Sequence, residues 1–117
     1  MPRPDTAPSP EEVYDLLYLL GLKAKSTAFF QLAYAVRLGA KQPQRLLVMQ
    51  WVYPEIARCY HTDARMVERN IRRLSITAWK NAPDKLRRMA GGDLTAAPLP
   101  ARFVSILALQ LRKGSAA

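Results

Sequence analysis

Apolar residues recur at helical spacing along most of the chain, and proline and glycine residues divide that pattern into segments. The segments that predict helices are 10–20, about 26–38, 45–53, 54–60, 64–79, 83–90 and 101–112. The flanking residues, 1–9 and 114–117, lack this periodicity and predict a disordered lead and a frayed tail. We therefore predict a single all-α domain over residues 10–113, a compact bundle of about six helices.

Several residues indicate where these helices begin and end. Ser9 and Glu12 have the spacing of a capping box, which predicts the start of the first helix. Glycine ends many helices, so Gly21 and Gly39 predict the ends of the first two. Pro54 lacks an N–H group and disfavours a helical residue before it, so we expect it to break one helix and begin another.

The spacing of a few residues in the middle of the chain is typical of a helix-turn-helix motif. Ala57 is a small residue where a second helix can cross closely, and Val67 follows ten residues later, where that helix packs back. Thr62 or Asp63 supplies the N-cap of the second helix. His61 occupies the turn position where glycine is commonest. The helix that begins at residue 64 is therefore the predicted recognition helix.

Placed on a helix at about 100° per residue, residues 64–80 separate into two faces. An apolar stripe consists of Val67, Ile71, Leu74 and Ala78. The opposite side carries the basic residues Arg65, Arg69, Arg72, Arg73 and Lys80. Arginine can donate two parallel hydrogen bonds to guanine, and Glu68 can accept one from a cytosine amino group. We count Asn70 in this surface, and expect Ile76, on the basic side, to contact another element or a partner subunit.

The charge of the chain supports a polyanionic partner. It has 18 Lys and Arg against 9 Asp and Glu, a formal net charge of +9. Eight basic residues and two acidic ones lie between Arg65 and Arg88. Such a field attracts nucleic acid, an anionic membrane surface or an acidic protein. The narrow apolar stripe opposite the basic residues is unlike a wide lipid-facing one, so we expect double-stranded DNA and no membrane. An ordinary solvated surface is the alternative interpretation.

Other chemistry has little support in the sequence. With a single cysteine and a single histidine, Cys59 and His61, a zinc site would lack ligands. We expect Cys59 to be buried, His61 to be exposed in a turn, and Trp51 and Trp79 to lie in the core. No catalytic set or glycine-rich phosphate loop is present, so we predict no enzyme, cofactor, metal or small-molecule substrate. The N-terminus is no signal peptide, which predicts a cytoplasmic location.

The sequence also resembles the C-terminal, DNA-binding effector domain of the master response regulator of bacterial sporulation, the sporulation initiation factor A family. The matching pieces are Tyr53-Pro54, Ile56-Ala57, Thr62, Val67-Glu68-Arg69, Ile71-Arg72 and Ala78-Trp79. The resemblance spans about residues 13–112. It implies a six-helix domain that binds a short TGTCGAA-type box, as a homodimer or as tandem copies on repeated sites. It also implies base contacts from Glu68 and Arg69 and places Arg72 at the DNA surface.

This sequence departs from the family at the edge that would contact bases. Arg65, Met66 and Arg73 stand where the family has serine, arginine and histidine, which puts the same box in doubt. We also expect the chain to act without a phosphoacceptor receiver domain. The predicted base contacts come from Arg65, Glu68 and Arg69. The predicted contacts to the DNA backbone or groove edge come from His61, Thr62, Arg72, Arg73 and Lys80.

The alternative function is a helical protein-interaction module that lost specific DNA binding, with a partner at Ile76, Phe30 or the last helix.

Overall fold

The computed structural model describes residues 8–116, and within this range the chain forms six α-helices, one 3-10 helix and no β-strand. The α-helices are α1 (Pro10–Leu19), α2 (Thr27–Lys41), α3 (Met49–Cys59), α4 (Ala64–Asn81), α5 (Pro83–Met89) and α6 (Pro100–Ala116). The 3-10 helix η1 (Pro43–Val48) lies between α2 and α3. The predicted all-α bundle is confirmed.

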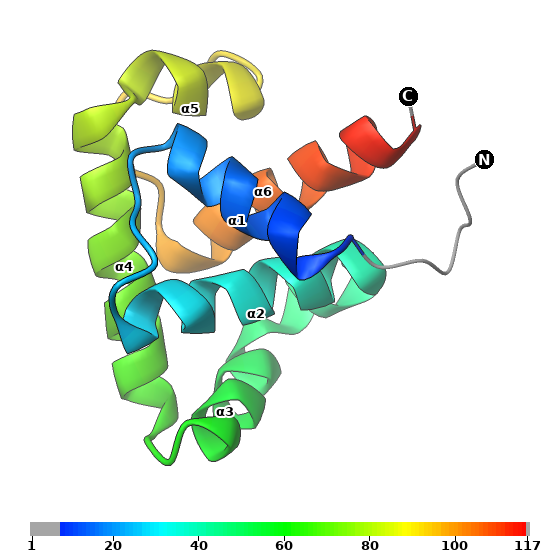
Figure 1. Cartoon of the computed structure of the whole chain (residues 1–117), viewed down its shortest axis with the longest axis vertical. Coiled ribbons are helices and arrows are strands. Elements are labelled where there is room, and N and C mark those ends of the chain that lie inside the picture. The colour runs from blue at the N-terminus through cyan, green and yellow to red at the C-terminus, as the bar shows by residue number, and fades with distance from the viewer. Residues whose placement is uncertain (1–7, 117) are drawn as a thin grey trace.

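Helix α2 lies at the centre of the bundle and packs most extensively against α6 and α4. Figure 1 shows α4 along one edge of the molecule, with α3 near its N-terminal end and α5 near its C-terminal end. The start of α1 and the end of α6 lie on the other side of the molecule, away from α4 (Figure 1). Every α-helix contributes fully buried side chains to one core, among them Leu17, Phe29, Leu32, Ile56, Ile71, Leu86, Phe103 and Leu107. This core holds α4 at the surface with one face inward.

Local signals in the sequence determine both ends of α1. The Glu12 backbone N–H donates to Ser9 Oγ, and the Ser9 N–H donates to Glu12 Oε1, both at 3.2 Å, which completes the predicted capping box. At the other end, Gly21 has φ +76°. This conformation lets the Leu22 N–H donate to the Leu17 carbonyl at 3.1 Å, as in a Schellman motif. The predicted start and stop of the first helix are confirmed.

The two predicted flexible ends differ in part from the structure. Residues 1–7 of the expected disordered lead lie outside the described residues, but Pro8 is buried, and its carbonyl accepts a 2.8 Å hydrogen bond from Arg37 Nε of α2. Ser9 is the N-cap of α1. At the other end, α6 continues to Ala116 rather than ending near residue 112. Ala117 lies outside the described residues.

Gly39 does not end α2, which continues to Lys41. It is a packing position, because a Cβ atom added there would come within 2.5 Å of Leu46 Cδ2 and 3.3 Å of Ala108 Cβ. Glycine at this position therefore lets η1 and α6 approach the backbone of α2. The sequence pattern identified a special glycine but assigned it the wrong role.

The predicted helix break at Pro54 is also wrong. Residues 43–48 form η1, and α3 runs without interruption from Met49 to Cys59 with Pro54 inside it. Because Pro54 has no N–H group, the helix lacks one backbone hydrogen bond, the one that position 54 would donate to the Gln50 carbonyl. Buried residues lie on both sides of the proline, namely Met49, Val52, Tyr53, Ile56 and Ala57. We attribute the continuity to this burial, which outweighs the loss of one bond.

Two expected core residues of α3 are exposed. Trp51 is 67% exposed because it lies on the side of the helix away from the buried positions. Cys59 is the last residue of α3 and is also exposed. Trp79, by contrast, packs against the core as predicted, and the Arg87 guanidinium lies 5.2 Å from the centroid of its ring.

Candidate nucleic-acid interface

A short turn joins α3 to α4 and fixes where α4 begins. The Thr62 backbone N–H donates to the Ala57 carbonyl at 3.0 Å. This bond closes α3 as a Schellman motif, which requires a left-handed residue at position 61, and His61 has φ +53°. Ala57 and Val67 are both buried in the common core, as the ten-residue spacing predicts. The helix, short turn and second helix expected from the sequence are therefore present.

Asp63, rather than Thr62, caps the N-terminus of α4. Its Oδ1 atom accepts a 2.9 Å hydrogen bond from the Met66 backbone N–H. The carboxylate also lies at the positive end of the helix dipole, which stabilises the first turn. The first turn of α4 thus has a defined start directly after the exposed turn residues His61 and Thr62.

The inner face of α4 is fully packed. Val67, Ile71 and Ala78 have no exposed surface, and Leu74 is partly buried against the same core. Ser75 is also fully buried, which the sequence pattern did not indicate. Its Oγ atom donates a 2.6 Å hydrogen bond to the Pro98 carbonyl, which satisfies the buried hydroxyl.

Asn70 belongs to the inner side of α4 rather than to the surface proposed for base contacts. Its Nδ2 atom donates a 2.8 Å hydrogen bond to Oε1 of Gln31, which is buried on α2. Asn70 is accordingly only partly exposed. This contact and the Ser75–Pro98 bond lie on opposite flanks of the apolar stripe, so together they fix the rotation of α4 about its axis.

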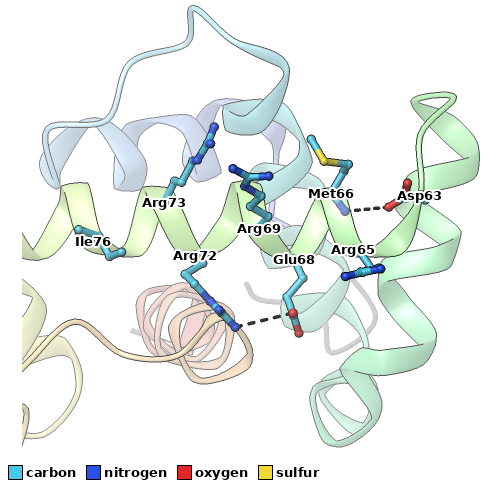
Figure 2. Close-up of a pocket in the computed structure, with 8 residues that line it drawn as sticks. All are labelled: Asp63, Arg65, Met66, Glu68, Arg69, Arg72, Arg73 and Ile76. Carbon is cyan, nitrogen blue, oxygen red and sulfur yellow. Dashed lines mark hydrogen bonds and ion pairs between the residues drawn. The ribbon is translucent and has the colours of Figure 1, made fainter.

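The outer face of α4 lines an open hollow. The residues around it are Asp63, Arg65, Met66, Glu68, Arg69, Arg72, Arg73 and Ile76. Figure 2 shows Met66, Arg69 and Arg73 pointing to one side of the helix, and Arg65, Glu68 and Arg72 to the other. All of these side chains except that of the capping Asp63 come from α4 itself, and the row of arginines covers about three turns of it.

Five of the eight predicted contact residues line this hollow, and the structure brings those five together on one helix face. The other three, His61, Thr62 and Lys80, are exposed but lie beyond its two ends. Ile76 is 54% exposed and is not among the described residues that pack against the core, so the expected contact with a partner subunit stays a prediction. Met66, which was not among the predicted contacts, is 40% exposed and lines the hollow.

One ion pair lies within the candidate interface. Arg72 Nη2 is 3.7 Å from Glu68 Oε1, and both side chains are about half exposed. Exposed pairs with i, i+4 spacing contribute only about 0.3–0.5 kcal/mol. Arg72 and Glu68 can therefore exchange this pair for contacts with a ligand at small cost.

Tyr53 of α3 lies at the border between the core and this charged face. Its side chain is 6% exposed, and within the described residues its hydroxyl has no hydrogen-bond partner. Burial is the main cause that raises the pKa of Tyr53 to about 12, with a smaller upward contribution from nearby Glu68 and an opposing one from Arg72. The phenol is therefore neutral at physiological pH, and its pKa depends on the charges of Glu68 and Arg72.

The described residues contain no group of three or more His, Cys, Asp or Glu side chains placed to hold one metal ion. None of the helices in residues 8–116 combines the length and the apolar character needed to cross a membrane.

Comparison with models of known protein families identifies one family that matches this sequence. The family model described as "Sporulation initiation factor Spo0A C terminal" matches residues 13–111, nearly the whole chain. No curated protein gives a sequence match. The matched family is one of DNA-binding effector domains rather than of enzymes, in agreement with an all-α fold that exposes an arginine-rich helix. The chain therefore belongs to the family of Spo0A C-terminal, DNA-binding effector domains.

Proposed function

We propose that this domain regulates transcription by binding double-stranded DNA at specific sequences, with α4 placed in the major groove. Membership of the family supports DNA binding itself, and the outer face of α4 supports this particular mode. An α-helix fits the major groove, and the N-terminal residues of a recognition helix lie nearest to the base edges. The predicted cytoplasmic location belongs to the same proposal.

The observation that carries this proposal is that several arginines without a partner in the described residues are clustered on the outer face of α4. Arg58 on α3 and Arg88 on α5 also lack such a partner, but each lies on another helix. Arg45, Arg87 and Arg102 each pair with a carboxylate at 2.9–3.0 Å. Arg37 and Arg112 donate to backbone carbonyls of the fold. Within residues 8–116, Arg65, Arg69 and Arg73 form no ion pair or side-chain hydrogen bond, although they lie next to one another on one face. Three clustered guanidinium groups without partners are suited to a polyanion.

The position of each residue along α4 supports its proposed role. Arg65, Glu68 and Arg69 lie in the first two turns, where side chains reach base edges. Arg72, Arg73 and Lys80 follow further along the helix, and His61 and Thr62 precede it, so we assign these five to the DNA backbone or the groove edge. On repeated sites the domain binds as a homodimer or as tandem copies.

Selection of bound duplexes from a random pool tests the proposal directly, and salt titration then tests the source of the affinity. If four to six phosphates are neutralised, log K should fall against log salt with a slope of about −4 to −5. A duplex that binds at low salt with this slope supports the proposal. A flat salt dependence, or no duplex binding at low salt, would instead support the protein-interaction module.

Arg69→Ala tests the specificity. It should weaken binding to the selected site by about 1–3 kcal/mol and change binding to a scrambled duplex little, because only base contacts carry sequence information. Arg88→Ala, an exposed arginine on α5, is the matched control and should give at most a small, uniform loss. The measurement is a paired titration of each variant against both duplexes. Equal losses on both duplexes for Arg69→Ala would make Arg69 a phosphate contact.

A further inference from the structure

Two apolar side chains interrupt the charged outer face of α4. Met66 is 40% exposed and Ile76 is 54% exposed, and both line the same hollow as the arginines. Met66 points to the same side of the helix as Arg69 and Arg73 (Figure 2). The backbone of Met66 is fixed by the Asp63 cap, so its side chain is presented from a defined position. The candidate interface therefore combines polar groups with one well-placed apolar group in its first turn.

Position along the helix separates these two residues. Met66 is the third residue of α4, in the turn that comes nearest to base edges when a recognition helix enters the groove. Ile76 lies ten residues later, which is about 15 Å further along the helix axis. The major groove is about 12 Å wide, so the two side chains face different parts of the DNA. Met66 is the one placed to contact bases.

The chemistry of the major groove offers a single apolar group to such a side chain. Base edges there present hydrogen-bond donors and acceptors, and thymine alone adds a C5-methyl group. Methionine is unbranched, flexible and polarizable, so its side chain can change conformation to stay in contact with a methyl group whose position varies slightly. We propose that Met66 recognises the C5-methyl group of a thymine next to the base pair contacted by Arg69. This inference rests on the proposed function of α4 and adds a specificity-determining residue to it.

The expected effect follows from the size of a methyl group. Removing one buried methyl from an apolar contact corresponds to a roughly three- to fivefold change in Kd. The Met66→Ala variant should lose the preference for thymine over uracil. The Met66→Leu variant should keep most of this preference, because leucine retains an apolar side chain of similar volume. Neither change affects a buried residue, so the fold should be the same in both variants.

The test replaces each thymine of the selected duplex by deoxyuridine, one at a time, and measures Kd for the wild type, Met66→Ala, Met66→Leu and Ile76→Ala. We expect one position, beside the base pair that depends on Arg69, where loss of the methyl group weakens wild-type binding three- to fivefold. At that position Met66→Ala should bind thymine and uracil duplexes equally. Met66→Leu and Ile76→Ala should retain the difference, which attributes it to the apolar contact in the first turn.

The outcomes separate this inference from the proposed function. If the wild type prefers the selected duplex over a scrambled one but no thymine is sensitive to loss of its methyl group, the role of Met66 is wrong and α4 still binds DNA specifically. The same conclusion follows if Met66→Ala keeps the full uracil penalty, or if the selected site has no thymine. If the wild type shows no preference for the selected duplex, the proposed function fails and this inference fails with it.

Discussion

The two faces of α4 differ in what their side chains contact within the protein. On the inner face, Val67, Ile71 and Ser75 are fully buried, and the Ser75 hydroxyl is hydrogen-bonded. On the outer face, Arg65 and Arg69 are exposed and form no ion pair in the described part of the chain. One helix can therefore combine a structural face with a binding face, because the helical period places the two on opposite sides. Inner substitutions should change the free energy of unfolding, and outer ones should change affinity for DNA.

The inner face also determines which residues the outer face presents. The bonds from Asn70 to Gln31 and from Ser75 to Pro98 lie on either side of the apolar stripe. A rotation of α4 by one residue, about 100°, would break both bonds and expose the stripe. The arrangement of the arginines is therefore set by contacts on the opposite side of the helix.

Replacing a buried apolar side chain of α4 should produce the largest effect. Ile71→Ala removes a fully buried side chain from the core and should lower the free energy of unfolding by about 3–4 kcal/mol. Ile76→Ala on the same helix is the matched control, because Ile76 is exposed, and should change stability by less than about 0.5 kcal/mol. Urea denaturation measures both. Similar losses for the two variants would contradict the division into faces.

Removing the buried hydroxyl should have a smaller effect. Ser75→Ala leaves the Pro98 carbonyl without its donor and should cost about 2 kcal/mol of unfolding free energy. Thr77→Ala provides the comparison, because the exposed Thr77 hydroxyl donates only to the Arg73 carbonyl of the same helix, at 3.0 Å. Its loss should be within about 0.5 kcal/mol. A neutral Ser75→Ala variant would show that the bond to Pro98 contributes no net stability.

Tyr53, at the border of the two faces, should show the smallest effect, and only at high pH. Its pKa is raised from 10.0 to about 12 in the folded state. The unfolding free energy is therefore unaffected by titration of Tyr53 below pH 10 and falls as pH rises toward 12, where the unfolded state loses the phenol proton more readily. Tyr53→Phe should remove about 1–2 kcal/mol of this loss, measured as unfolding free energy between pH 10 and 12. Tyr34 and Tyr60, whose pKa values burial also raises, should account for part of the remaining slope.

Tyr18→Phe controls for the loss of a hydroxyl from an exposed tyrosine. At neutral pH, Tyr53→Phe should leave stability unchanged or slightly higher, because the buried hydroxyl has no partner in the described residues. An alkaline slope identical to that of the wild type would mean that Tyr53 does not titrate in the folded domain as its burial implies.

Features that depend on neighbouring residues in the chain were predictable from the sequence. The capping box at Ser9 and Glu12 and the stop at Gly21 are short-range signals, and both are confirmed. The apolar and basic faces of α4 follow from the helical period, so Val67 and Arg69 appear on the expected sides. The left-handed turn residue was indicated by the position of His61. The roles of the individual arginines on DNA stay predictions.

Features decided by distant residues were missed. Gly39 resembles a helix stop until Leu46 and Ala108 are seen to pack against it. Pro54 resembles a break because the sequence does not show that both halves of α3 are buried against the same core. Asn70 resembles part of a polar surface because its partner, Gln31, lies 39 residues earlier in the chain. In each instance a tertiary contact outweighed a local preference.

The placement of the two chain ends has a practical consequence for experiments. The first described residue, Pro8, is held to α2 by Arg37. The start of α1 and the end of α6 lie on the side of the molecule away from α4 (Figure 1). A surface tether, fluorophore or fused reporter attached at either end should therefore extend away from the arginine row. Domains immobilised through either end should capture duplexes equally well, whichever end is used.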